Sequence, residues 1–173
     1  MTFPLVASSA PSQDRTFCTF RLGEGLFGLD AMLVQSVNLP PPLTPLPHAP
    51  AAVCGYVNLR GQIHLILDLK ELLKLGPVRA GPDTRLIVFK AVLGDPFGVL
   101  IDHVGGVVSL QSDQIEASRP AETDSPADAL VYGVGKLDGE LITLLDAGKV
   151  LPAVERSLAA GRRTTSSHAM EMA

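Results

Sequence analysis

Three acidic residues could do chemistry, because each ends a run of apolar residues of the kind that forms a strand. They are Asp68, Asp102 and Asp146. Carboxylates placed in this way can act as acids, bases or phosphate acceptors, so an acidic catalytic site built on the three is one hypothesis. Asp68 and Asp146, however, each precede a short helical pattern, where an N-cap worth about 1 kcal/mol accounts for the carboxylate. The N-cap interpretation is favoured for these two, and Asp102 is expected near a groove.

A glycine-rich segment, Gly23-Glu24-Gly25-Leu26-Phe27-Gly28, satisfies the G-x-G-x-x-G pattern of dinucleotide-binding loops. That chemistry also requires a helix that holds the pyrophosphate and an acidic residue about 20 residues later for the ribose. No Asp or Glu lies between Asp30 and Asp68. A glycine-rich hairpin turn is therefore the favoured interpretation.

Metal-ligating and nucleophilic residues are scattered along the chain. The four histidines are His48, His64, His103 and His168. No two of them lie three or four residues apart, and the C-x-x-C spacing of zinc sites does not occur. There is no P-loop and no G-x-S-x-G elbow. The sequence predicts no metal, no cofactor and no catalysis, and the two cysteines, Cys18 and Cys54, are expected to be free, buried thiols.

The composition is that of a folded, weakly charged protein. A chain of 173 residues is long enough to bury a core of its own. Charged residues make up 18% of it, compared with about 25% in average soluble proteins. The 14 basic and 18 acidic residues argue against a general nucleic-acid binder. No stretch approaches the ~20 apolar residues that span a bilayer, so a cytoplasmic protein without membrane insertion is expected.

Short apolar runs separated by Gly, Pro and Asp predict a mostly β protein. The expected strands are Phe17–Leu22, Leu26–Leu29, Val53–Leu59, Gln62–Leu67, Leu86–Val92, Phe97–Ile101, Val104–Leu110, Leu130–Leu137 and Glu140–Leu145. Residues 59–62 and 137–140 are expected to be hairpin turns, and Asp138-Gly139 is a preferred pair for a type I′ turn. A proline-crowded segment, residues 40–50, is expected to be a stiff crossing between strands rather than a polyproline ligand.

Helices and chain ends complete the prediction. One short helix is expected over Leu69–Leu75 after Asp68, with residues 68–71 resembling a capping box. A second is expected over 146–160, with a break near Pro152. Residues 1–14 and 161–173 lack apolar periodicity and are expected to be a flexible lead and a flexible tail.

An internal repeat divides the intervening chain. Residues 55–73 align with 133–151 without gaps at an offset of 78, and residues 27–37 align with 97–107 at an offset of 70. Neither half could bury much core alone. The repeat predicts two similar β modules, about 15–80 and 81–151, which share a core and form a groove at their junction.

The segment Gly55-Tyr56-Val57-Asn58-Leu59-Arg60-Gly61-Gln62-Ile63, followed by Leu67-Asp68-Leu69-Lys70, strongly resembles the signature hairpin of the CheW-like adaptor domain of bacterial chemosensory systems. Segments 27–30 and 97–102 also resemble that family, so the resemblance spans about Thr16 to Leu151. It implies two SH3-like five-stranded β-barrel modules around a shared core, in a CheW-like domain over 15–160.

The resemblance also implies a function. Proteins of this family are non-catalytic adaptors that couple the cytoplasmic tips of methyl-accepting chemoreceptors to the regulatory domain of a CheA-type histidine kinase, in receptor arrays at the membrane. The positions that match the family's receptor groove are Val34, Ser36, Asn58, Arg60, Gly98, Val104 and Val107. The kinase contacts would involve apolar edges of both barrels.

Departures from the family pattern leave the cognate pathway open. The family often has Glu where Ser36 stands and Pro where Leu65 stands, and Lys70 replaces the usual Arg. Flagellar, twitching, gliding and second-messenger outputs all fit the sequence. Two other functions remain as alternatives: a small-molecule-binding β-barrel module that uses the groove as a pocket, and the acidic enzyme site described above.

Overall fold

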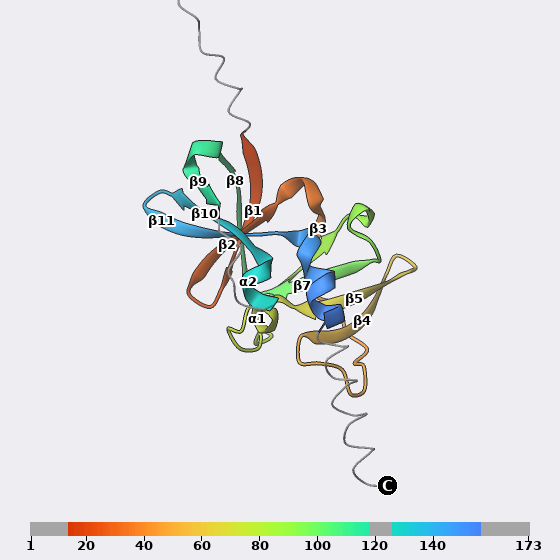
Figure 1. Ribbon diagram of the computed structural model, residues 1–173. Coiled ribbons are helices and arrows are strands. Elements are labelled where there is room, and N and C mark those ends of the chain that lie inside the picture. The colour runs from red at the N-terminus through yellow and green to blue at the C-terminus, as the bar shows by residue number, and fades with distance from the viewer. Residues whose placement is uncertain (1–13, 118–125, 157–173) are drawn as a thin grey trace, which may run out of the picture.

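The structure, a computed structural model, describes residues 14–117 and 126–156. The strands in these residues form two sheets that share a core (Figure 1). The first sheet contains β1 (Arg15–Leu22), β2 (Gly25–Asp30), β8 (His103–Leu110), β9 (Ile115–Ala117), β10 (Val131–Leu137) and β11 (Glu140–Leu145). Its strand order is β8-β1-β2-β11-β10-β9.

The second sheet has five strands, in the order β3-β6-β7-β5-β4. They are β3 (Val34–Asn38), β4 (Val53–Leu59), β5 (Gln62–Asp68), β6 (Arg85–Phe89) and β7 (Phe97–Ile101). The helices are short: α1 (Leu69–Leu72), α2 (Pro126–Leu130) and the 3-10 turns η1 (Ala31–Leu33), η2 (Ala91–Leu93), η3 (Ser112–Gln114) and η4 (Ala147–Lys149). Residues 150–156, which follow η4, are also helical.

The two sheets confirm the internal repeat. When each strand is replaced by its repeat equivalent, the order β3-β6-β7-β5-β4 becomes β8-β1-β2-β11-β10. The hydrogen-bond register repeats as well. Ile66 lies opposite Gly98 in the parallel pair β5–β7, and the equivalent residues Leu144 and Gly28 lie opposite each other in β11–β2. A duplication that preserves register explains why the two halves have similar sequences.

The sheets do not follow the module boundaries expected from sequence, 15–80 and 81–151. β1 and β2 belong to the first half but pair with β8 and β11 of the second, whereas β6 and β7 pair with β3 and β5 of the first. Each half therefore gives its first hairpin to the sheet of the other half. The parallel pairs β2–β11 and β5–β7 join residues far apart in the sequence, so the exchange leaves no local signal in the chain.

The core is correspondingly continuous. Phe20 and Leu29 of the first sheet are buried in the same cluster as Leu67 and Phe89 of the second. Each sheet also encloses a smaller cluster: Phe17, Leu110, Ile142 and Leu144 in the first, and Val57, Ile66, Leu86 and Val88 in the second. Complete burial of each such side chain contributes about 1.5–3 kcal/mol, so the shared cluster binds the halves into one unit.

All nine strands predicted from the sequence are present. The strand predicted over Leu86–Val92 ends at Phe89, because Ala91–Leu93 form a 3-10 turn that leaves Val92 exposed. Two strands, β3 and β9, are absent from the prediction. Both are short edge strands, in which one face is open to solvent and the apolar alternation is weak.

The helices differ in length from the prediction. α1 ends at Leu72 rather than Leu75, and Lys74 adopts a left-handed conformation, with φ 62°, that no helix continues. The predicted break near Pro152 is absent, because this proline stands in the first turn of the helix over 150–156, where its missing N–H requires no partner. The predicted lead up to residue 13, helical residues 157–160 and tail 161–173 lie outside the described residues.

The proline-crowded segment is an irregular crossing between β3 and β4, as predicted. Its backbone runs alongside β4 and forms one antiparallel bridge with it. The N–H of Thr44 donates to the carbonyl oxygen of Tyr56 at 2.8 Å, and the N–H of Tyr56 donates to the carbonyl oxygen of Thr44 at 2.9 Å. Gly55, with φ 141°, leaves room for this approach, since a Cβ there would collide with the carbonyl oxygen of Thr44. In the described part of the chain, no helix has the length and apolar character needed to cross a membrane.

Candidate functional site

Two of the three strand-end acids are helix caps. Asp68 begins α1: its Oδ1 accepts from the N–H of Glu71 at 3.1 Å, and its Oδ2 accepts from the N–H of Val78 at 2.9 Å. Asp146 begins η4 by accepting from the N–H of Gly148 at 3.0 Å. The N-cap prediction is confirmed for both residues.

Asp102 links the β1–β2 turn to helix α1. Its Oδ2 accepts from the N–H of Gly23 at 2.7 Å and lies 3.1 Å from Nζ of Lys70. Gly23, with φ 58°, stands in the β1–β2 turn, so the glycine-rich segment is the predicted hairpin turn rather than a dinucleotide loop. Within residues 14–117 and 126–156, no group of three or more His, Cys, Asp or Glu side chains could hold a metal ion.

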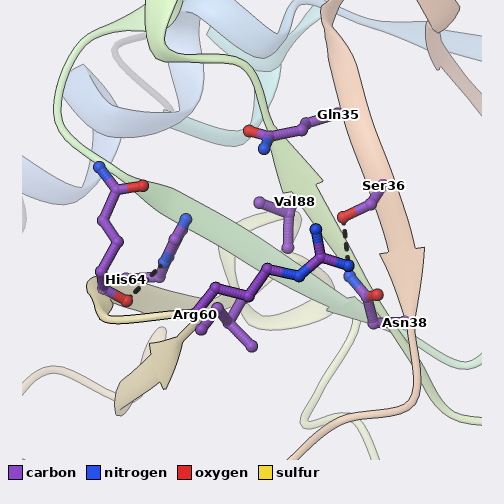
Figure 2. Close-up of a pocket in the computed structure, with 8 residues that line it drawn as sticks. Gln35, Ser36, Asn38, Arg60, His64 and Val88 are labelled. Atoms are coloured by element: carbon purple, nitrogen blue, oxygen red, sulfur yellow. Dashed lines mark hydrogen bonds between the residues drawn. The ribbon is translucent and has the colours of Figure 1, made fainter.

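A pocket of about 270 Å³ opens between β3 and the β4–β5 hairpin (Figure 2). We call it the polar pocket. It is lined by Gln35, Ser36, Asn38, Leu59, Arg60, Gln62, His64 and Val88. Because β3 and β4 are the two edges of the five-stranded sheet, the sheet must curl until its edges approach each other, as in a small barrel. Among the residues that line the pocket, Arg60 is the one that belongs to the charged types Asp, Glu, Lys and Arg.

The hairpin turn places Arg60 at the mouth of the polar pocket. Arg60 and Gly61 have φ values of 52° and 83°, which are the two positive values of a type I′ turn. Oδ1 of Asn58 accepts from the N–H of Gly61 at 2.8 Å and steadies the turn. Figure 2 shows the Arg60 side chain reaching across the pocket toward Ser36 and Asn38. Among the described residues, its guanidinium has neither an ion-pair partner nor a hydrogen-bond partner.

The opposite wall of the pocket belongs to β3. Nδ2 of Asn38 donates to Oγ of Ser36 at 2.8 Å. The pairing of β3 with β6 shifts register between Val34 and Ser36, an irregularity of the kind that changes which way a side chain points. The wall facing Arg60 is therefore polar but uncharged.

The polar pocket contains two of the seven predicted groove residues, Ser36 and Arg60. Val34 is half-buried against the shared core. Gly98 is buried on β7, where a Cβ would stand 2.7 Å from the carbonyl oxygen of Ile87. Gly98 thus permits close packing of β6 and β7 and offers no side chain to a partner.

The remaining three predicted residues lie elsewhere. Asn58 lines a neighbouring hollow of about 340 Å³ together with Tyr56, Ile63 and the prolines Pro41 and Pro42. Val104 and Val107 lie on β8, the edge of the first sheet; Val104 is half-buried, and Val107 is 67% exposed. The predicted groove residues therefore cover both sheets and form no single cavity.

Sequence reasoning missed six residues of the polar pocket: Gln35, Asn38, Leu59, Gln62, His64 and Val88. For His64 a signal existed. Its repeat equivalent is Ile142, which is buried in the first sheet, so an imidazole stands where the duplicated strand has an apolar side chain. His64 is itself 5% exposed.

Both cysteines are free, as predicted; Cys18 is buried, whereas Cys54 is half-buried rather than buried as expected. Burial raises the pKa of both thiols, and the Asp68 carboxylate adds to the effect at Cys54, whose pKa rises to about 12. A thiol with so high a pKa is protonated at neutral pH and is a poor nucleophile. Cys54 therefore gives no support to a catalytic site.

Comparison with protein families gives a match that covers nearly all of the described chain. The sequence profile described as "CheW-like domain" matches residues 16–155. Among curated proteins, a chemotaxis protein CheW of Rhizobium meliloti (strain 1021) is 32% identical over 146 residues, which are 84% of this chain and 92% of the relative. The protein FrzA of Myxococcus xanthus is 35% identical over 150 residues, or 85% of this chain and 90% of FrzA.

A solved structure agrees with the sequence matches. The crystal structure of the scaffolding protein TtCheW from Thermoanaerobacter tengcongensis superimposes with a TM-score of 0.69 and 31% sequence identity. The superposition covers 77% of this chain and 89% of that protein. The similarity therefore extends over both sheets.

Proposed function

The chain belongs to the CheW-like domain family, and from that premise we propose that it couples methyl-accepting chemoreceptors to a CheA-type histidine kinase without catalysing a reaction. The observation that carries the proposal is the match of residues 16–155 to the family, together with relatives named as chemotaxis and scaffolding proteins. None of the relatives named above is described as a small-molecule-binding protein. We propose a cytoplasmic protein that is recruited to receptor arrays.

The receptor tip is proposed to dock over Arg60. Arginine is favoured at interface hot spots because its guanidinium offers several donors in a rigid, planar arrangement. Arg60 is exposed, and a turn with a fixed backbone conformation holds it over a pocket of neutral polar groups. Val107, on β8, offers an exposed apolar contact on the other sheet.

The kinase is proposed to dock on apolar edges of both barrels. Ile63 and Leu141 occupy equivalent positions in the β4–β5 and β10–β11 hairpins, and their side chains are 55% and 61% exposed. Each of these hairpins, one on each sheet, thus offers an exposed apolar side chain as a contact for a partner domain.

Binding measurements test this proposal. The full chain is titrated with a helical-hairpin fragment of a chemoreceptor signalling tip and, separately, with the regulatory domain of a CheA-type kinase. We expect both to bind, and we expect Leu141→Asp to weaken kinase binding while receptor binding is retained. Failure of cognate fragments of both partners to bind would contradict the coupling function.

A further inference from the structure

We propose that His64 is a second contact for a partner carboxylate in the polar pocket, and that binding of this carboxylate takes up a proton at His64. The inference rests on the proposed function, because the receptor tip that docks over Arg60 supplies the carboxylate. It assigns the class of group that enters the pocket and adds a residue that determines specificity.

The hydrogen bonding of His64 fixes its tautomer. Nδ1 lies 3.1 Å from the carbonyl oxygen of Gln62, which can only accept, so Nδ1 carries a hydrogen. In the neutral ring Nε2 is then an acceptor, and in the protonated ring it is a donor. Nε2 has no hydrogen-bond partner among the described residues. It is also not one of the fully buried polar atoms that lack a partner, since Tyr132 Oη is the one such atom in the described chain. Nε2 is therefore accessible from the pocket.

The charges around His64 favour an anion. Its lining neighbours from β3 are Gln35, Ser36 and Asn38, all uncharged. Val57 lies opposite His64 on β4, and Val88 reaches the pocket from β6. Arg60 is the charged group that faces the pocket, and no carboxylate lines it. An unpaired guanidinium in such surroundings binds a carboxylate better than a neutral group.

A carboxylate in the pocket has two oxygens to satisfy. One can accept from Arg60. The other can accept from Nε2 of His64 only when the ring is protonated, because the neutral ring presents a lone pair to it. Binding therefore draws a proton from solvent onto His64. Histidine changes charge between about pH 5 and pH 8, so affinity should rise as the pH falls through this range.

The fold itself does not require an imidazole here. The equivalent residue, Ile142, fills the corresponding place in the first sheet with an apolar side chain. The imidazole is therefore best explained by what enters the pocket.

Calorimetric titration with the receptor-tip fragment tests the proposal. Titrations at about pH 8 and about pH 6 should show binding at least about threefold tighter at the lower pH, because a histidine gains its charge between these two values. Titrations in two buffers that differ in ionisation enthalpy measure proton uptake directly. His64→Gln should still bind at the higher pH and should lose both the pH dependence and the proton uptake.

Three controls make the outcome decisive. His48→Asn replaces another histidine, in an exposed loop position with φ 59° that asparagine tolerates, and should keep the pH dependence. His64→Ile, which introduces the side chain found at the equivalent position 142, serves if the glutamine variant fails to fold. A receptor fragment whose tip carboxylates are replaced by amides should bind without proton uptake.

Two results overturn the inference: affinity that does not rise at lower pH, or a rise that persists in His64→Gln and His64→Ile. Either result leaves the coupling function standing, because the fragment still binds. Absence of binding at every pH contradicts the proposed function instead.

Discussion

Arg60 and Asp138 occupy the same position in equivalent hairpin turns and carry opposite charges. Their φ values are 52° and 49°, and each is followed by a glycine with φ near 80°, Gly61 at 83° and Gly139 at 80°. The backbone of this turn thus accepts either side chain, and nothing in the turn requires an arginine. What calls for an arginine lies outside the turn, where Arg60 lines the polar pocket.

This relationship provides a matched pair of variants. Arg60→Ala should weaken binding of a receptor-tip fragment by about tenfold or more, which is about 1.4 kcal/mol. Its melting temperature should stay unchanged, since exposed substitutions usually alter stability by no more than about 0.5 kcal/mol. Asp138→Ala should leave the affinity unchanged and lower the melting temperature slightly, because aspartate is preferred over alanine at this positive φ. Equal affinities for wild type and Arg60→Ala would remove Arg60 from the interface.

Ser36 should govern which receptor tip is bound. Ser36→Glu places a carboxylate on the wall that faces Arg60, where it can pair with the guanidinium inside the pocket. We expect the variant to fold and to change its order of preference across a panel of receptor-tip fragments. Ser36→Gln has a similar shape without the charge and should retain the wild-type order. An unaltered order in the glutamate variant would place Ser36 outside the interface.

The exchange of hairpins should make the two halves mutually dependent. Residues 15–80 contain β1 and β2, which pair with β8 and β11 of the other half. Alone, the fragment 15–80 therefore leaves strand edges and part of the core uncovered. Calorimetry of the whole chain should therefore show one unfolding transition. Fragments 15–80 and 81–156 should each remain unfolded alone and regain structure when mixed. Two resolved transitions, or a folded single half, would contradict the shared core.

The two helix caps should differ in their contribution to stability. Asp146→Ala removes one capping hydrogen bond and should lower the free energy of unfolding by about 1 kcal/mol. Asp68→Ala should cost more, because it removes two hydrogen bonds at a residue that is only 5% exposed. Chemical denaturation of both variants measures the difference. Equal losses would show that the bond to the N–H of Val78 adds nothing.

Much of the fold follows from local sequence signals. Asp138-Gly139 predicted a hairpin turn, Asp68 and Asp146 predicted caps, and apolar runs predicted the strands, because each of these features depends on neighbouring residues. The exchange of hairpins depends on pairing between strands far apart in the chain, such as Leu144 with Gly28, and no local pattern encodes it. Edge strand β3 was missed because polar residues occupy the face that lines the pocket.

The candidate site was less predictable than the fold. Arg60 could be selected because its turn needs no arginine, but the packing role of Gly98 depends on the approach of the Ile87 carbonyl from a neighbouring strand. His64 was visible only as a departure from the internal repeat. Its neighbours in the pocket come from β3 and β6, whose positions follow from the curling of the whole sheet.

The coupling function is tested most directly by co-sedimentation. Vesicles that carry chemoreceptor cytoplasmic fragments are mixed with a CheA-type kinase, with and without this protein, and the kinase that sediments with the vesicles is measured. We expect that wild-type protein increases the sedimented kinase severalfold, that Arg60→Ala abolishes most of the increase, and that Asp138→Ala preserves it. Kinase recovery that is the same with and without the wild-type protein, when each pair of components is shown to be folded and cognate, would contradict the coupling function.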